Sequence, residues 1–221
     1  MFDAIDSMRA NASPDLYVAS SMTIAEHLVP VWLSVLRTSR PTLHVGLRVT
    51  NSQDVQRLVL EGHADIGLIE TPSLDSRLEA RVIAHDRLAV VVAPSHPWAS
   101  RTAPLRPDDL AAAQLIVREP GSGTREALDR WLASRAPTEP LLELGSNSAV
   151  KGAVKAGAGP AVLSVLAVRD DLRSEQLVEV EVEEIDLNRP LLAVWPRGRG
   201  LDEPSTALLS IASQHRHECG P

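Results

Sequence analysis

The amino-acid sequence predicts an α/β fold made of two Rossmann-like lobes. Short apolar runs alternate with amphipathic helical patterns along the 221 residues, and this alternation favours a mainly parallel sheet covered by helices. A unit of strand, small polar loop and helix occurs four times, with its loops at residues 20–23, 51–53, 121–124 and 146–148. About 70 residues separate the first pair of loops from the second pair, so we expect one pair in each lobe.

The first part of the chain contains three expected strands with helices between them. Pro30 should kink or restart the first helix because proline has no amide hydrogen. Gly62 is placed to end the second helix, and the apolar run before Glu70 is typical of a strand that is covered on both faces. The strands are expected at 16–19, 43–49 and 64–70, and the helices at 24–36 and 55–61.

The second part continues the alternation with shorter elements. Pro94 ends an apolar run, and Pro107 is placed to open a brief helix. Gly157 is expected to cap a later helix. The expected strands are 88–93, 115–117, 141–144, 161–164, 177–182 and 191–195, and the expected helices are 107–110, 124–136, 148–157, 165–172 and 205–215.

The loop at 118–124 is the most informative stretch of the chain. Its Gly-Ser-Gly-Thr sequence connects an apolar strand to a helix, so unpaired amide groups and the positive end of the helix dipole face the loop. Gly121 and Gly123 allow close approach of the backbone, and Ser122 and Thr124 add hydroxyl donors. This combination predicts a seat for a small anion.

Composition excludes several classes of function. The formal net charge of −7 gives no bulk attraction to nucleic acid or to an acidic membrane, and four Trp, one Tyr and one Phe are too few for a base-stacking platform. No apolar run is long enough to span a bilayer, and residues 1–13 lack the layout of a signal peptide. Cys219 is the one cysteine, which fits a cytoplasmic protein without an internal disulfide.

Five stretches together resemble the effector-binding domain of LysR-type transcriptional regulators. The two most specific are Leu-Glu-Gly-His-Ala-Asp-Ile-Gly-Leu at 60–68 and Arg-Glu-Pro-Gly-Ser-Gly-Thr-Arg at 118–125. The others are 18–30, 91–97 and 156–164, in the order and spacing that the family shows. The resemblance implies a fold like that of the type 2 periplasmic binding proteins, with two lobes joined by two crossover segments.

The family also implies boundaries and partners. One lobe would take residues 15–86 and 166–215, and the other 87–165, with crossovers near 86–88 and 164–166. Residues 1–14 would be the stub of a linker helix, and 216–221 a tail. The family implies a homodimer or higher oligomer, and DNA binding through an N-terminal winged helix-turn-helix that these 221 residues do not include. No membrane partner is expected.

The resemblance and the loop chemistry predict the residues of an effector site. Hydroxyl and amide groups would hold a small anion or organic acid, although Ser, Thr and Asn at these positions are also ordinary helix caps. Arg118 could offer a planar fork to a carboxylate, or it could pair with Glu119, Glu70 or the opposite lobe. The predicted site residues are Ser21, Thr23, Asn51, Arg118, Gly121, Ser122, Thr124, Ser146 and Asn147.

We expect no catalysis, cofactor or metal. Ser122 lacks the Gly-x-Ser-x-Gly setting of a hydrolase nucleophile, and its loop lacks the Gly-Lys-Ser/Thr ending of a nucleotide-binding loop. His215, His217 and Cys219 lie in a polar terminal stretch, where a frayed end is a better interpretation than a metal site. A solute-binding protein of a transport system and an enzyme on the same fold are the alternatives, because fold alone does not decide function.

Overall fold

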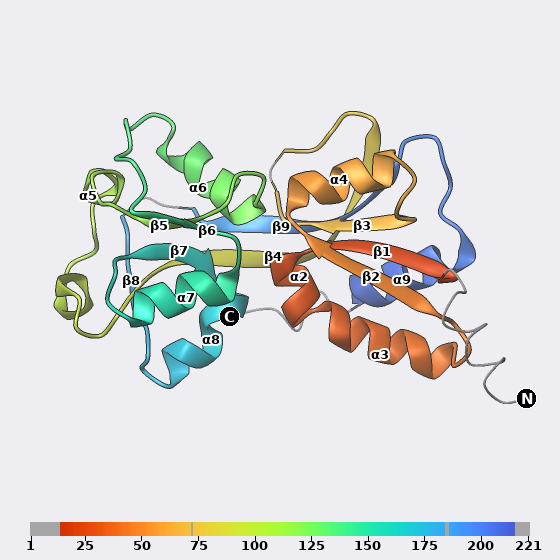
Figure 1. Ribbon diagram of the computed structural model, residues 1–221, viewed down its shortest axis with the longest axis horizontal. Coiled ribbons are helices and arrows are strands. Elements are labelled where there is room, and N and C mark those ends of the chain that lie inside the picture. The colour runs from red at the N-terminus through yellow and green to blue at the C-terminus, as the bar shows by residue number, and fades with distance from the viewer. Residues whose placement is uncertain (1–13, 72, 184–185, 215–221) are drawn as a thin grey trace, which may run out of the picture.

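The computed structural model describes residues 14–71, 73–183 and 186–214, and its first lobe is a sheet with helices on both faces (Figure 1). The elements of this lobe are β1 (Leu16–Ser21), α2 (Met22–His27), α3 (Val29–Ser39), β2 (Val45–Thr50), α4 (Ser52–Leu60), β3 (Ile66–Ile69) and α9 (Glu203–Gln214). β1 pairs in parallel with β2 and β3. Val18 packs in the core cluster of α2, α3 and α9, whereas the next residue, Ala19, packs in the cluster of α4. Burial on both faces explains the continuous apolar runs of β1 and β3.

The second lobe repeats this layered arrangement. Its elements are η1 (Pro97–Ser100), α5 (Pro107–Ala111), β5 (Ile116–Arg118), α6 (Gly123–Leu132), β6 (Leu142–Leu144), α7 (Asn147–Lys155), β7 (Ala161–Ser164), α8 (Val165–Arg173) and β8 (Val178–Val180). Val90 packs with Leu110 and Leu128 on one face of the sheet. Val91 packs with Val150 and Val168 on the other. The α/β class and the two-lobed architecture are therefore confirmed.

One strand, β4 (Leu78–Val92), runs through both lobes, and β9 (Asn188–Pro196) lies beside its first part (Figure 1). The first part of β4, up to Arg87, pairs antiparallel with β9, and from Leu88 onward β4 pairs with β7. The described strands form one nine-stranded sheet in the order β2-β1-β3-β9-β4-β7-β5-β6, and β8 pairs with β4 beside this path. A single strand thus carries the sheet from one lobe into the other.

The course of the chain differs from expectation in two places. The sequence predicted a strand only at 88–93, but β4 begins at Leu78, because its first part finds an antiparallel partner in β9. The second crossover was expected at 164–166, but β8 pairs with β4 and Val168 packs in the second lobe. The chain therefore returns to the first lobe between Val182 and Asn188. The expected linker stub, except Pro14, and the tail at 216–221 lie outside the described residues.

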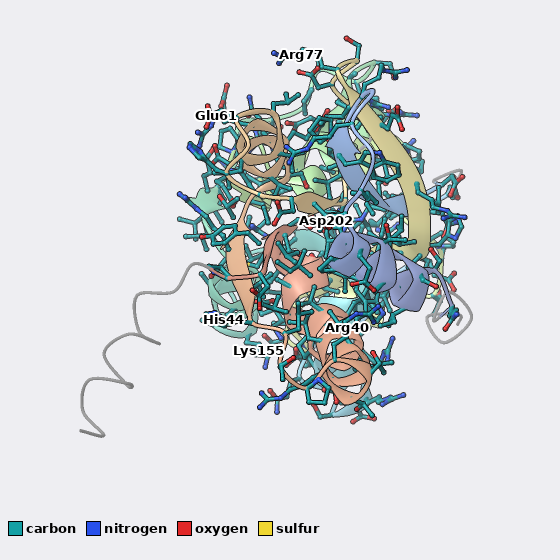
Figure 2. The ribbon with its side chains drawn as sticks, turned by 90° about the vertical axis from the view of Figure 1, so that its right-hand side faces the viewer. Arg40, His44, Glu61, Arg77, Lys155 and Asp202 are labelled. Atoms are coloured by element: carbon teal, nitrogen blue, oxygen red, sulfur yellow. The ribbon has the colours of Figure 1, made fainter. Side chains whose placement is uncertain are left out.

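Charged side chains gather at the periphery of the first lobe. Figure 2 views this lobe from its outer end, with Arg77 at the top, Glu61 and His44 at the left, and Arg40 in the lower middle. Arg40 forms an ion pair with Glu203, which connects the end of α3 to the start of α9. Among the described residues, no helix has both the length and the apolar character needed to cross a bilayer.

Candidate functional site

The four polar loops meet where the lobes face each other. At the N-terminus of α4, the amide of Gln53 donates a hydrogen bond of 3.2 Å to the carbonyl oxygen of Gly121, just before α6. At the N-terminus of α7, Nδ2 of Asn147 donates to Oγ1 of Thr23 in α2, at 3.4 Å. α4 therefore faces α6 across the interface, and α2 faces α7. The predicted convergence of four helix N-termini is observed.

The α4–α6 side is a contact of bare backbone, which we name the glycine contact. Gly121 has φ of +84°, and a Cβ atom there would lie 2.9 Å from Oε1 of Gln53 and 3.0 Å from Oδ1 of Asn51. A Cβ atom on Gly123 would lie 2.6 Å from the carbonyl oxygen of Glu70. Both glycines of the predicted loop thus permit close approach, and what approaches them is the other lobe.

The α2–α7 side depends on side chains instead, and we name it the amide contact. Asn147 is 1% exposed, and besides Thr23 its Nδ2 reaches Oε2 of Glu26 at 3.4 Å. Its Oδ1 accepts a hydrogen bond of 2.6 Å from Nη1 of Arg118. One amide therefore bridges the lobes and also orients a buried guanidinium.

Arg118 forms the ion pair that the sequence offered as one alternative. Its Nε and Nη2 donate to the two carboxylate oxygens of Glu119 at 2.8 and 2.9 Å. With Nη1 bonded to Asn147, all three guanidinium nitrogens have partners. In this arrangement Arg118 is a support for the site and does not present an open fork.

Three other predicted residues have identifiable partners. Asn51 caps α4 by accepting from the amide of Asp54 at 2.8 Å, and Ser146 caps α7 by accepting from the amide of Ala149 at 3.1 Å. Thr124 is 2% exposed, and its hydroxyl accepts a bond of 3.2 Å from a guanidinium of the β9 strand. Asn51 and Ser146 therefore act as helix caps in this structure.

Ser21 and Ser122 differ from all these residues. Each is 1% exposed and occupies an N-cap position, one before α2 and the other before α6. Within the part of the chain that the structure describes, neither hydroxyl has a hydrogen-bond partner. Buried polar groups without a partner are rare in folded proteins, so these two have unused capacity to donate and accept.

A buried cluster of charges beside the loops was not predicted as part of the site. Arg189 of β9 is 4% exposed, and its Nη2 lies 2.7 Å from Oδ2 of Asp86 and 3.0 Å from Oε2 of Glu70. Arg189 also donates to Thr124, and Ser164 donates to Oδ1 of Asp86 at 2.8 Å. These bonds connect β4 and β9 to residues of both lobes. The cluster has no local motif, and the one sequence signal is a lone acid at the end of an apolar run, Glu70.

Burial raises the pKa of Glu70 above its ordinary value, and the Arg189 guanidinium opposes this rise. A hydrogen bond from Thr23 also favours the charged form of Glu70, whereas the neighbouring Asp86 disfavours it. Desolvation therefore disfavours the charged form of the Glu70 carboxyl group, and the cation that it shares with Asp86 favours that form.

Neither a metal cluster nor an open anion site is found elsewhere in the described residues. In the described ranges, no group of three or more His, Cys, Asp or Glu side chains is placed to hold a metal ion, and residues 215–221 lie outside those ranges. A cavity of about 740 Å³ opens beside α4 and meets the interlobe contacts at Asn51 and Gln53. Its cations are already paired, Arg57 with Asp54 and Arg77 with Asp75, so it offers no open anion site.

Comparison with known proteins identifies the family. The family described as LysR substrate binding domain matches residues 9–216. The HTH-type transcriptional regulator Rv2282c of Mycobacterium tuberculosis is 40% identical over 221 residues, which is 95% of this chain and 70% of that protein. YeiE of Escherichia coli K12 is 38% identical over 185 residues, 83% of this chain and 62% of YeiE. CbbR of Xanthobacter flavus is 33% identical over 197 residues, 88% of this chain and 59% of CbbR.

Solved structures show the same fold. The Synechocystis CcmR regulatory domain in complex with 2-PG superposes with a TM-score of 0.83 at 24% identity, covering 91% of this chain and 97% of that one. The effector binding domain of QuiR in complex with shikimate gives 0.80 at 16% identity, covering 92% and 97%. The chain therefore belongs to the LysR family of transcriptional regulators and contains its substrate binding domain.

Proposed function

We propose that the interlobe site binds a small anionic metabolite through Ser21 and Ser122. The observation that carries this proposal is the pair of buried hydroxyls, one from each lobe, that find no partner among the described residues. Each lies at the start of a helix, where amide groups and the helix dipole favour negative charge. A ligand held by both hydroxyls would contact both lobes at once.

The chemical class follows from the donors and from relatives of the same fold. Hydroxyl and amide donors suit the oxygens of a carboxylate or another oxyanion. The CcmR regulatory domain was solved with 2-PG and the QuiR domain with shikimate, and these ligands are supporting examples for a small organic acid here. Thr23 and Gly121 border the two hydroxyls and complete the proposed cradle.

Binding would act by changing the angle between the lobes. The effect on the protein can be only as large as the ligand's preference for one arrangement over the other. In the proposed cytoplasmic regulator, two or more copies of this domain associate and pass the change to helix-turn-helix modules on DNA. The relatives named as HTH-type regulators support this role over that of a transport protein.

The test is stabilisation of the chain by sulfate, shikimate and 2-PG, followed by titration of whichever compounds stabilise it. Ser21→Ala and Ser122→Ala should each weaken binding by about 10- to 150-fold, because each loses a hydrogen bond to a charged group worth about 1.5–3 kcal/mol. Ser148→Ala is the matched control, since Ser148 is an exposed serine near the start of α7. Unchanged affinity in both site variants would overturn the proposed cradle.

A further inference from the structure

Glu70 lies beside the proposed site, against Thr23 and Gly123, although it was not predicted there. It follows β3, its side chain is 2% exposed, and its backbone lies against Gly123 at the start of α6. The amide of Glu70 donates to Oγ of Ser52 in α4 at 3.2 Å. The hydroxyl of Thr23 in α2 bonds to its carboxylate. This carboxylate is therefore enclosed by the helices whose N-termini form the anion seat.

The charges around Glu70 do not balance in favour of an anion. β9 contributes Arg189 and β5 contributes Arg118, and both guanidiniums are buried. Against these two cations stand three carboxylates: Glu70 itself, Asp86 of β4, which shares Arg189, and Glu119, which pairs with Arg118. From α6, the uncharged Thr124 bonds to Arg189, and the carboxylate of Glu126 accepts a hydrogen bond from Thr71, the residue after Glu70. The two guanidiniums and three carboxylates already carry one negative charge in excess. A bound anion would add a further negative charge to them.

We propose that Glu70 takes up one proton from solvent when an anion binds, so that Glu70 couples occupancy of the site to pH. This inference rests on the proposed function, and it identifies Glu70 as the residue that makes anion binding depend on pH. The proton adds to a carboxylate oxygen of Glu70, and no other bond forms or breaks. Arg189 keeps Asp86 as its partner, and the neutral carboxyl group becomes a hydrogen-bond donor.

The surroundings of Glu70 favour its protonation when an anion binds. Burial already raises the pKa of Glu70, and an added anion would raise it further by repelling the charged form. Ionised Glu70 instead opposes an anionic guest. The anion and the proton therefore favour each other, which is reciprocal linkage between two ligands of one site.

The experiment titrates the whole chain with sodium sulfate, a probe whose charge is constant between pH 5 and 8. Calorimetry in two buffers that differ in ionisation enthalpy should show uptake of about one proton at the upper end of this range. Sulfate affinity should fall about tenfold per pH unit there, as expected for one linked proton. Glu70→Gln imitates the neutral form, so it should bind sulfate without proton uptake and with affinity nearly independent of pH.

Asp170→Asn makes the same change of net charge at a side chain that is 95% exposed, and it should keep the pH dependence of the parent chain. Any dependence of sulfate affinity on pH that remains in Glu70→Gln comes from other titrating groups, such as His27. The parent chain and the variant both contain those groups. Sulfate binding by the parent chain without pH dependence or proton uptake overturns the role of Glu70 but leaves the anion site intact. Absence of sulfate binding in parent and Glu70→Gln alike at every pH overturns both.

Discussion

The glycine contact and the amide contact join the two lobes in opposite ways. At the glycine contact, Gly121 and Gly123 bring bare backbone against the other lobe, with no room for a Cβ atom. At the amide contact, Asn147 extends a side chain that hydrogen-bonds to Thr23 and to Arg118. The first contact is therefore sensitive to added atoms, and the second to removed atoms. This difference determines whether a substitution at each contact stabilises or destabilises the chain, and by how much.

The largest effect is expected at the cation that holds the glycine contact in place. Arg189→Met should destabilise the chain by about 3–5 kcal/mol, because it leaves Glu70 and Asp86 buried side by side without their shared partner. Urea unfolding measures this loss. Arg173→Met is the control, since Arg173 is 74% exposed at the end of α8 and should change stability by less than about 0.5 kcal/mol. A loss below about 1 kcal/mol for Arg189→Met would show that the cluster is not a structural anchor.

Adding one methyl group should come next. Gly123→Ala places a Cβ atom 2.6 Å from the carbonyl oxygen of Glu70, so the lobes must shift or the backbone must deform. We expect a loss of about 1–3 kcal/mol in thermal or urea unfolding. Gly152→Ala in α7 adds the same methyl group in open space, and it should stabilise by about 0.5–1 kcal/mol. Equal effects of the two changes would contradict the close contact.

Removing the bridging amide should have a similar or smaller effect. Asn147→Ala takes one partner from the buried Arg118 and from Thr23, at an expected loss of about 1–3 kcal/mol. Asn147→Asp keeps the shape and an acceptor for Arg118 but loses the donor to Thr23. Comparing the two by urea unfolding separates the interlobe bond from the support of Arg118. Stability of Asn147→Ala equal to that of the parent would remove the amide contact from the account of lobe closure.

The smallest effects separate a cap from a ligand contact. Asn51→Ala loses an observed cap bond to the amide of Asp54 and should cost about 1 kcal/mol. Ser122→Ala removes a hydroxyl that makes no bond to the described residues, so it should change stability by less than about 0.5 kcal/mol. Thermal unfolding without ligand measures both. A clear loss in Ser122→Ala would mean that its hydroxyl caps α6 in solution.

The parts of the fold with local signals could be predicted from sequence. Each strand, polar loop and helix unit combines an apolar run with Gly, Ser, Thr or Asn at its turn, and the units at Ser21, Asn51 and Ser122 are found where those signals lie. The restart of the first long helix also follows from Pro30, which occupies the first turn of α3. These features depend on a few neighbouring residues, which a pattern can capture.

The parts that depend on distant pairing could not be predicted. The first part of β4 mixes charged and apolar residues, and it becomes a strand because β9 lies beside it. Glu70 follows β3, Asp86 lies in β4 and Arg189 lies in β9, and the two farthest apart are separated by 119 positions. Nothing near any one of them indicates that they meet. The charge balance of the site was missed for the same reason.

The position of β9 in the sheet has a consequence for synthesis of the chain. β9 inserts between β3 and β4, yet its residues, Asn188–Pro196, leave the ribosome long after both neighbours. Until then the nascent chain carries two open strand edges, which are prone to pair with other chains. A variant that slows translation or truncates the chain before Asn188 would expose those edges to aggregation and to chaperones.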